Sequence, residues 1–282
     1  MIVHEGHAHM PEFQRLYPPA RPAAGAAHWF VFRGDEIVLD AGGSPLLAGD
    51  AQQPASLAAS RTLLLGTRAG VPLLAGILVG ELPEQHTAVH LRTLLATADE
   101  ETATRAGHAA QLLRWDAAAR YCQQCGGGLV AITRDHSWGR ECPACGALYY
   151  PPISPAIIVL IHDGDRTLLT TKTGWGKRYS LVAGFVEPGE TFEACVIREV
   201  AEEVGVLVGD VRYTGSQAWP FPHQMMVGFT ARYLSGAVVI DTEELAHADW
   251  FDRDALPELP PPFAIARRII DGWLDGSYAV AR

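Results

Sequence analysis

Hydrophobic and polar positions change their spacing along the chain, and this spacing predicts an alternation of strands and helices. Short apolar runs bounded by glycine, proline or aspartate predict strands. Apolar residues that recur every three or four positions predict helices. The predicted strands lie within residues 28–40, around a tight turn at Gly34 and Asp35, and at 61–66, 73–79, 156–161, 167–172, 181–185, 211–214, 226–234 and 237–240. The predicted helices lie at 90–97, 103–120, 192–204 and 264–274.

The second half of the chain predicts a layered α/β domain. The continuous apolar run at 156–161 is typical of a buried central strand. The helix at 192–204 follows Thr191, a suitable N-cap, and ends where Gly205 can close it. Mixed strands with an inserted loop, helix and loop predict an α/β/α arrangement. The apolar stripe expected on the last helix consists of Ile265, Ile269, Ile270 and Trp273.

The first third of the chain echoes the later domain. Residues 34–39 read Gly-Asp-Glu-Ile-Val-Leu, and residues 164–169 read Gly-Asp-Arg-Thr-Leu-Leu. We therefore interpret the N-terminal part as an α/β domain that is a degenerate copy of the later one. Nothing in residues 1–115 forms a catalytic cluster, so this domain is expected to supply scaffold, dimer contacts or a pocket wall.

Three carboxylates share one side of the helix at 192–204. Glu199, Glu202 and Glu203 stand at positions i, i+3 and i+4, where like charges destabilise an isolated helix. A hard divalent cation would reverse this effect, because Mg²⁺ takes oxygen ligands and works with substrate phosphates. The alternative is a solvated acidic face, which three glutamates alone would favour. The apolar positions of the same helix are Cys195, Val196, Val200 and Val204.

Composition and charge narrow the classes of function. Hydrophobic residues make up 48% and charged residues 19% of 282, which is typical of a globular protein. The net charge of −10 argues against broad affinity for nucleic acid but leaves room for a small phosphorylated ligand. No apolar run is long enough to span a bilayer, and the first residues lack the features of a signal peptide. We expect a cytoplasmic protein with no membrane partner.

Four of the five cysteines form two tight pairs, Cys122 with Cys125 and Cys142 with Cys145. Each pair has two intervening residues and is followed by a glycine, and sixteen residues separate the pairs. Such knuckles can place four thiolates around a structural Zn²⁺. A redox dithiol and a nucleic-acid-binding ribbon are the alternatives. The fifth cysteine, Cys195, is expected to be a small buried hydrophobe.

Two motifs carry a family resemblance. From Gly184 to Val206 the sequence reads G-x5-E-x7-R-E-U-x-E-E-x-G-U, with U aliphatic, and resembles the Nudix box at every defining position. From Ser216 onward, Ser-Gln-Ala-Trp-Pro-Phe-Pro-His-Gln resembles the S-Q-P-W-P-F-P-x-S motif of the NADH pyrophosphatase (NudC-type) branch of the Nudix hydrolases. The cysteine module is similar to that of the same branch. Ala218 and Gln224 depart from the branch motif, at its proline and its last serine.

The resemblance implies an architecture of three parts. Residues 151–282 would be a catalytic Nudix domain, an α/β/α sandwich around a mixed sheet. Residues 116–150 would be a small zinc ribbon, and residues 1–115 the N-terminal α/β domain. The resemblance further implies a homodimer.

The implied reaction is divalent-metal-dependent hydrolysis of the pyrophosphate bond of NADH or NAD⁺, which gives NMN(H) and AMP. NAD-capped RNA is a further implied substrate. The metal, Mg²⁺ or Mn²⁺, would be held by Glu199, Glu202 and Glu203 of the box and by Glu244 from outside it, with Glu243 as the competitor of Glu244. Arg198 would orient these carboxylates by pairing with Glu190. Which glutamate is the general base stays open.

The resemblance also implies the substrate-binding residues. Tyr150 and Phe185 would sandwich a nucleobase. The other implied substrate-binding residues are Gln217, Ala218, Trp219, Pro220, Phe221, Pro222, His223, Gln224 and Ala266. For the Trp-Pro-Phe-Pro segment, the alternative is a rigid loop that packs its aromatic rings on the core.

Two other classes of function compete with this interpretation. One is a Nudix hydrolase of another dinucleotide, such as a diadenosine polyphosphate, ADP-ribose or FAD. The other is a non-catalytic zinc-ribbon protein that senses a nucleotide. The intact glutamate set favours an enzyme over a sensor.

Overall fold

The fold is taken from a computed structural model, which describes residues 13–278 except 19, 21, 23, 56 and 135. The chain divides into two compact units, Met1–Pro152 and Ile153–Arg282. The further division of the first unit into an N-terminal domain and a zinc ribbon stays a prediction.

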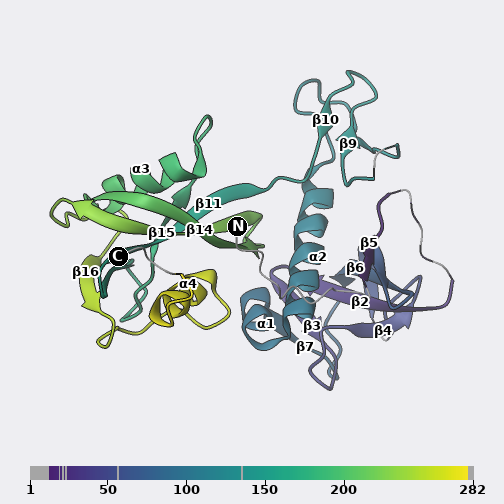
Figure 1. The fold of residues 1–282 in the computed structure, drawn as a ribbon. Helices are drawn as coiled ribbons and strands as arrows, with labels where there is room; N and C mark the ends of the chain where they lie inside the picture. The colour runs from purple at the N-terminus through teal and green to yellow at the C-terminus, as the bar shows by residue number, and fades with distance from the viewer. Residues whose placement is uncertain are drawn as a thin grey trace. The chain divides into compact units, whose positions relative to one another are not determined.

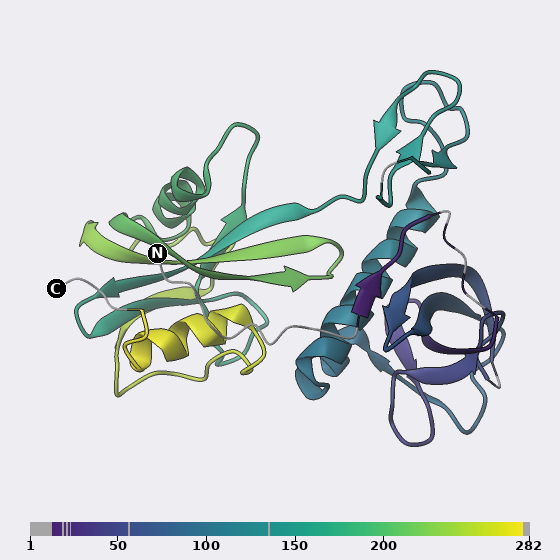
Figure 2. The ribbon, with the colours of Figure 1, turned by 45° about the vertical axis from the view of Figure 1, so that its right-hand side comes forward.

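The first unit contains a seven-stranded sheet with the order β1-β5-β6-β2-β3-β7, in which β4 also pairs with β2. Helix α2 (Glu100–Ala118) packs against β2, β5 and β6 of this sheet (Figure 2), and the shorter α1 (Leu91–Thr97) precedes it. The predicted hairpin at residues 28–40 and both predicted helices are confirmed. The strands are β1 (Phe13–Arg15), β2 (Ala26–Arg33), β3 (Glu36–Leu39), β4 (Leu47–Asp50), β5 (Ala58–Arg68), β6 (Val71–Val79) and β7 (Thr87–His90).

The second unit contains a six-stranded mixed sheet with the order β14-β15-β11-β12-β16, in which β13 also pairs with β11. Helix α3 (Phe192–Val204) covers one face and α4 (Ile265–Leu274) the other, which gives the predicted α/β/α layers (Figure 1). Because both faces are covered, β11 is buried at seven consecutive positions, 156–162. The strands are β11 (Ser154–Asp163), β12 (Arg166–Thr171), β13 (Val182–Phe185), β14 (Leu207–Trp219), β15 (Gln224–Ser235) and β16 (His247–Asp252).

A separate apolar cluster fills each side of the second sheet. The side under α3 holds Cys195 and Val200, both fully buried, so Cys195 is the buried hydrophobe that its position predicts. The side under α4 holds Ile265, Ile269, Ile270 and Trp273, which form the expected stripe.

The two large sheets share one topology. In each, a central strand pairs in parallel with one neighbour and antiparallel with the next, β2 with β6 and β3, and β11 with β15 and β12. Even the irregularities agree. A bulge in β5 places Arg61 at φ 48°, and the corresponding bulge in β14 places Asp210 at φ 51°. These matches confirm that the N-terminal sheet is a copy of the later one.

The copies differ at the segment that carries the acidic helix. In the second unit, residues 186–206 connect β13 to β14 and contain α3. In the first unit, only residues 51–57 connect β4 to β5, and those that are described form no helix. The N-terminal copy therefore kept the sheet and lacks the helix that bears the candidate metal ligands.

Some strand predictions were wrong in extent or existence. Residues 237–240 form no strand, because the chain there lies against the end of α3, where the Val239 N–H donates to the Val204 carbonyl. Strand β14 is far longer than the predicted 211–214 and includes Ser216–Trp219, so the second motif forms a hairpin rather than a free loop. The prediction missed β16, whose alternating burial is masked in sequence by acidic and aromatic neighbours.

A three-stranded sheet in the order β10-β9-β8 holds the cysteine module. Its strands are β8 (Val130–Ala131), β9 (Arg140–Glu141) and β10 (Leu148–Tyr149). Strands of two residues cannot bury a core of their own, so this module depends on some other cross-link.

Candidate active site

Helix α3 is fixed at both ends by the residues that the sequence singled out. The Thr191 hydroxyl accepts a hydrogen bond from the Ala194 N–H at 3.2 Å and caps the first turn. Gly205 ends the helix in the left-handed region at φ 73°. Between these ends, Cys195, Val196, Val200 and Val204 are fully buried against the sheet. This anchoring sets the rotation of the helix and hence the direction of its glutamates.

Arg198 connects the helix to the loop before it. Its Nε donates to Glu190 Oε1 at 2.6 Å and its Nη2 to Glu190 Oε2 at 2.9 Å, a bidentate pair. The Nη2 atom also donates to the Phe185 carbonyl at 3.0 Å. The hydrogen bonds from Arg198 and from the Glu187 N–H lower the pKa of Glu190 to about 2. The loop therefore folds back on the helix, as the expected pairing of Arg198 with Glu190 requires.

The same guanidinium holds two of the helix carboxylates. Its Nη1 donates to Glu199 Oε1 at 2.8 Å and to Glu202 Oε2 at 2.9 Å. Glu202 is well exposed, whereas the Glu199 side chain is only 12% exposed. Burial raises the pKa of Glu199 against the opposing effect of Arg198, and the charges of Glu202 and Glu244 raise it further.

Gly184 of β13 makes room for Glu199. A Cβ atom at position 184 would lie 1.8 Å from Glu199 Cδ, far inside van der Waals contact. The first glycine of the box is therefore needed because the glutamate side chain crosses directly over the backbone of β13.

Glu203 is the most buried carboxylate of the group. Its side chain is 3% exposed, and neither carboxylate oxygen has a hydrogen-bond partner among the described residues. Lys172, just after β12, places its Nζ 3.8 Å from Glu203 Oε1 and 3.5 Å from Glu244 Oε2. Burial, against the attraction of Lys172 and with added repulsion from Glu244 and Glu199, raises the pKa of Glu203 to about 7.

Glu244 comes to this cluster from a turn after β15. The turn is closed by hydrogen bonds from the Glu244 and Leu245 N–H groups to the Asp241 carbonyl. The competing Glu243 is exposed, and its backbone N–H donates to Asp241 Oδ1 at 2.8 Å. The structure thus brings Glu199, Glu203 and Glu244 into one electrostatically coupled group, with Glu202 at its exposed border.

This group fits a hard divalent cation. A buried carboxylate without hydrogen bonds is costly, and its protonation or a bound cation removes that cost. Glu203 has unused oxygens, and its nearest cation is a lysine at a distance longer than a good hydrogen bond. Carboxylate oxygens are the donors that Mg²⁺ and Mn²⁺ prefer.

The four paired cysteines gather at a second candidate metal site. Their Sγ atoms all lie within 4.8 Å of one another, with Cys122–Cys145 and Cys125–Cys142 each at 3.5 Å. Zn–S bonds of about 2.3 Å in a tetrahedron place the sulfurs about 3.8 Å apart, which fits this cluster. The two knuckles are alike, since Gly126 and Gly146 both adopt positive φ and donate to the carbonyls of Cys122 and Cys142.

The second motif forms the tip of the β14–β15 hairpin. Trp219 stacks on Phe263 with ring centroids 6.1 Å apart and meets Phe221 edge-on at 5.2 Å. Gln217 uses both ends of its amide beside α4, because Nε2 donates to the Phe263 carbonyl and Oε1 accepts from the Ile265 N–H. His223 Nδ1 lies 3.2 Å from the Ser154 hydroxyl. The motif therefore ties the hairpin to α4 and to the start of β11.

The remaining substrate candidates lie in different settings. Tyr150 belongs to the first unit and Phe185 to the second, and about half of each side chain is exposed. Ala266 is buried in α4, whereas Ala218 is exposed and Gln224 pairs with Trp219 in the hairpin. The proposed sandwich of Tyr150 and Phe185 stays a prediction.

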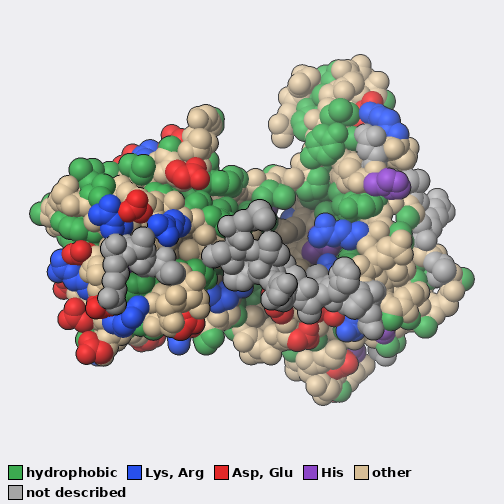
Figure 3. Space-filling view, in the orientation of Figure 1, with side chains coloured by type: hydrophobic (Ala, Val, Ile, Leu, Met, Phe, Trp, Pro, Cys, Tyr) green, Lys and Arg blue, Asp and Glu red, His purple; other side chains and the backbone are tan. Residues whose placement is uncertain are grey.

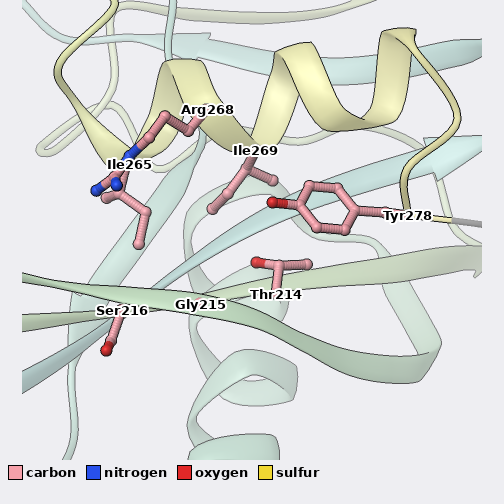
Figure 4. A pocket seen from close by; sticks show the side chains of 7 residues that line it. All are labelled: Thr214, Gly215, Ser216, Ile265, Arg268, Ile269 and Tyr278. Atoms are coloured by element: carbon pink, nitrogen blue, oxygen red, sulfur yellow. The ribbon is translucent and has the colours of Figure 1, made fainter. Parts of the chain in front are cut away.

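A small pocket lies between β14 and α4 (Figure 4). It is lined by Thr214, Gly215, Ser216, Ile265, Arg268, Ile269 and Tyr278. Its volume of about 70 Å³ has room for a few waters and not for a dinucleotide. The Thr214 hydroxyl is buried there without a hydrogen-bond partner among the described residues, and a water would satisfy it.

Sequence reasoning missed Lys172 and the role of Gly184. A signal for Lys172 was present, since the chain has only two lysines, Lys172 at the end of a predicted strand and Lys177 shortly after it. The close approach of Glu199 to Gly184 depends on how α3 crosses β13. This crossing cannot be predicted from residues that are neighbours in the sequence.

Comparison with known proteins places this arrangement in a family. Residues 152–273 match the NUDIX domain, and residues 26–115 match the NADH pyrophosphatase-like rudimentary NUDIX domain. The chain is 42% identical over 255 residues to the NAD-capped RNA hydrolase NudC of Chromobacterium violaceum, covering 89% of this chain and 94% of that protein. It is 39% identical over 261 residues to the protein of the same name from Deinococcus radiodurans, covering 90% and 89%. The identity to that of Pseudomonas aeruginosa is 45% over 185 residues, 65% of this chain and 66% of that protein.

The chain belongs to the Nudix hydrolases, in their NADH pyrophosphatase (NudC-type) branch. The resemblance drawn from the two motifs is thereby confirmed, and so is the interpretation of the first sheet as a degenerate copy.

The raised pKa of Glu203 predicts how the stability of the metal-free protein depends on pH. A carboxyl with a pKa of about 7 in the folded state, against an ordinary value of 4.5, binds more protons folded than unfolded. Its contribution to the free energy of unfolding is therefore lost as pH rises from about 4.5 to 7. Glu203→Gln should remove this loss, so that the variant gains up to about 3 kcal/mol over wild type by pH 8.

The measurement is urea unfolding of zinc-loaded protein, in buffer without other divalent cations, at pH 5 and pH 8. Glu202→Gln is the matched control, and solvent should screen its effect because that side chain is 60% exposed. A stability difference between Glu203→Gln and wild type that does not grow with pH would contradict the assignment.

Proposed function

We propose that the protein hydrolyses the pyrophosphate bond of NADH and NAD⁺ to NMN(H) and AMP, and removes the NAD cap from RNA. The observation that carries the proposal is the buried Glu203 carboxylate, which has no hydrogen-bond partner among the described residues and is repelled by Glu199 and Glu244. The names of the relatives and the NADH pyrophosphatase-like match of residues 26–115 support the choice of substrate.

Mg²⁺ or Mn²⁺ is the proposed catalytic metal, and Glu199, Glu202, Glu203 and Glu244 are its proposed ligands. When bound, the metal would neutralise the pyrophosphate charge and make a water nucleophilic. Arg198 holds Glu199 and Glu202 on one side and Glu190 on the other, so it fixes the carboxylates before substrate arrives. A glutamate of the box or Glu244 would accept a proton from the attacking water, and the choice between them stays open.

The proposed nucleotide wall is the β14–β15 hairpin tip. The rings of Trp219 and Phe221 are held by each other and by Phe263, so they can stack a base with little loss of side-chain entropy. The amide of Gln217 is already bound to the protein, which supports a role in holding this wall rather than in contacting the nucleotide directly. Tyr150 and Phe185 are the proposed pair that sandwiches a nucleobase.

Zn²⁺ is the proposed ion of the four-cysteine cluster, in a structural role. The β8–β10 sheet has too few residues for a core, and metal binding there supplies folding free energy. A homodimer in the cytoplasm is proposed from membership of the branch. No helix within the described residues is long and apolar enough to cross a membrane.

The substrate proposal predicts a ranking of turnover. With Mn²⁺ or Mg²⁺, NADH, NAD⁺ and NAD-capped RNA should be cleaved at the pyrophosphate, faster than ADP-ribose, FAD or diadenosine polyphosphates. Product identity by mass spectrometry checks this, because the bond cleaved is defined by NMN(H) and AMP from the free dinucleotide, and by NMN and 5′-monophosphate RNA from the capped transcript. Glu203→Gln should lower kcat by at least about 100-fold, since removing one group from such a centre typically costs orders of magnitude. A faster reaction with another dinucleotide would contradict the substrate, and near-wild-type turnover of Glu203→Gln would contradict the metal site.

Removal of one cysteine tests the zinc assignment. Cys142→Ser should bind less than one zinc per chain and should lower the thermal midpoint, because the remaining three thiolates hold the ion less tightly. Cys195→Ala is the control, since Cys195 lies in the apolar core of the second unit and should leave zinc content unchanged. Elemental analysis and thermal unfolding give both quantities. If zinc-free wild-type protein had the same thermal midpoint as zinc-loaded wild-type protein, a structural role of zinc would be ruled out.

A further inference from the structure

The loop at residues 172–178 joins β12 to the strand region before β13 and reads Lys-Thr-Gly-Trp-Gly-Lys-Arg. It holds both lysines of a chain whose other basic residues are arginines, and it has three positive charges in seven residues of a protein with net charge −10. The indole of Trp175 is 45% exposed. None of these features is used by the hydrolysis proposed above.

The loop is anchored to the sheet at its base and turned by hydrogen bonds. Thr170 and Ser180 exchange backbone hydrogen bonds of 2.9 and 2.8 Å, which close its base. Within it, the Trp175 N–H donates to the Lys172 carbonyl at 3.1 Å, and the Arg178 N–H donates to the Trp175 carbonyl. The tryptophan is thus held at the turn rather than carried on a loose segment.

Two glycines with positive φ flank Trp175. Gly174 and Gly176 adopt φ values of 88° and 68°, and a Cβ built on either would have no atom within 4 Å. A side chain at either position would be strained by the backbone. The turn that presents Trp175 therefore requires both glycines.

The loop borders the candidate reaction centre. Lys172, its first residue, lies 3.8 Å from Glu203 and 3.5 Å from Glu244. The Trp175 backbone is bonded to that of Lys172, so the indole belongs to the same turn as the lysine that meets the carboxylates. Lys177 is exposed and pairs with no acidic side chain within the described part of the chain, whereas Arg178 lies 3.7 Å from Glu258.

NAD-capped RNA and free NADH differ in the groups that they could place against the 172–178 loop. In an NAD-capped RNA, the adenosine of the NAD moiety is the first nucleotide, and the chain continues from its 3′ oxygen. The next phosphate and base therefore follow within one nucleotide of the pyrophosphate that is cleaved, whereas free NADH has nothing in that place. An exposed aromatic ring beside cations is the usual means of binding single-stranded nucleic acid, by stacking and by phosphate contact.

The face of the second unit drawn in Figure 3 shows, over its described residues, no continuous basic surface that would attract a polyanion. On the face drawn in Figure 3, acidic and basic side chains lie intermixed over the second unit. A local site must then supply the contact that the net charge does not.

We propose that the 172–178 loop binds the RNA body of an NAD-capped transcript, with Trp175 stacking on a base and Lys177 contacting a phosphate. This inference rests on the proposed function for its substrate. The loop is then a binding site for a part of capped RNA that the free dinucleotide lacks.

The test compares two substrates on one variant. Trp175→Ala should lower kcat/KM for a short NAD-capped RNA by about tenfold, the scale of losing one stacked base. It should leave kcat/KM for NADH within about twofold of wild type, because the indole contacts only the nucleotides that come after the adenosine. Tyr213→Ala, which removes another exposed aromatic ring (62% exposed) from the same unit, is the matched control and should change neither value. Trp175→Phe should restore most of the loss.

The salt dependence of capped-RNA binding tests the role of Lys177. Lys177→Gln should weaken capped-RNA binding and reduce the slope of log K against log salt by about 0.7, the value for one phosphate contact on a single strand. Arg232→Gln is the control, since Arg232 is an exposed cation paired with Asp210 at 2.6 Å. Equal losses on NADH and capped RNA for Trp175→Ala, or no loss on RNA, would overturn the proposal.

A binding measurement distinguishes a failure of this inference from a failure of the proposed reaction. Anisotropy of a labelled capped RNA, measured without divalent cations, reports RNA binding by the loop even if the protein does not catalyse the proposed reaction. RNA binding that depends on Trp175 in a protein that cleaves neither substrate would overturn only the reaction. RNA binding that is unchanged by Trp175→Ala and Lys177→Gln would overturn only the loop.

Discussion

The site depends on one unfavourable interaction, the burial of the Glu203 carboxylate without a hydrogen-bond partner among the described residues. The sheet-facing side of α3 imposes it, because Val200 and Val204 are fully buried next to it and fix the rotation of the helix. Glu199 crosses over Gly184, and Glu244 adds a third charge. Arg198 relieves Glu199 and Glu202, but Glu203 is left with a distant lysine. A bound divalent cation would relieve this repulsion, which is why these carboxylates are the proposed metal ligands.

The two copies of the sheet distinguish the part of the fold that carries the candidate site from the part that serves as scaffold. Both copies keep the same strand order, the same parallel central pair and the same bulge with a positive φ at Arg61 or Asp210. These features follow from packing and hydrogen bonding, which do not need a metal. The helix that carries Glu199 and Glu203 is present in one copy and absent among the described residues 51–57 of the other. The described part of the N-terminal copy therefore shares the sheet of the second unit and differs from it in this insertion.

The sequence predicted the parts of the site that local rules determine. Capping by Thr191 and Gly205 and the buried face of α3 follow from spacing along the chain, and the pairing of Arg198 with Glu190 was implied by the family resemblance. The four cysteines likewise reveal their cluster through spacing. The features that it could not predict are set by contacts between distant segments. Lys172 meets Glu203 only because β12 ends beside α3, and Gln217 caps α4 across 48 residues of chain. The strand predicted at 237–240 failed because that segment bonds to the end of α3 instead of to the sheet.

We expect a divalent cation to displace the proton of Glu203 when it binds, and calorimetry measures this displacement. Mn²⁺ is titrated into zinc-loaded protein at pH 6.5 in two buffers with different ionisation enthalpies. A carboxyl with a pKa of about 7 is mostly protonated at that pH, so binding should release more than about half a proton per metal ion. The observed enthalpy should then differ between the buffers for wild type and not for Glu203→Gln. Equal enthalpies in both buffers for wild type, or no Mn²⁺ binding, would contradict the account.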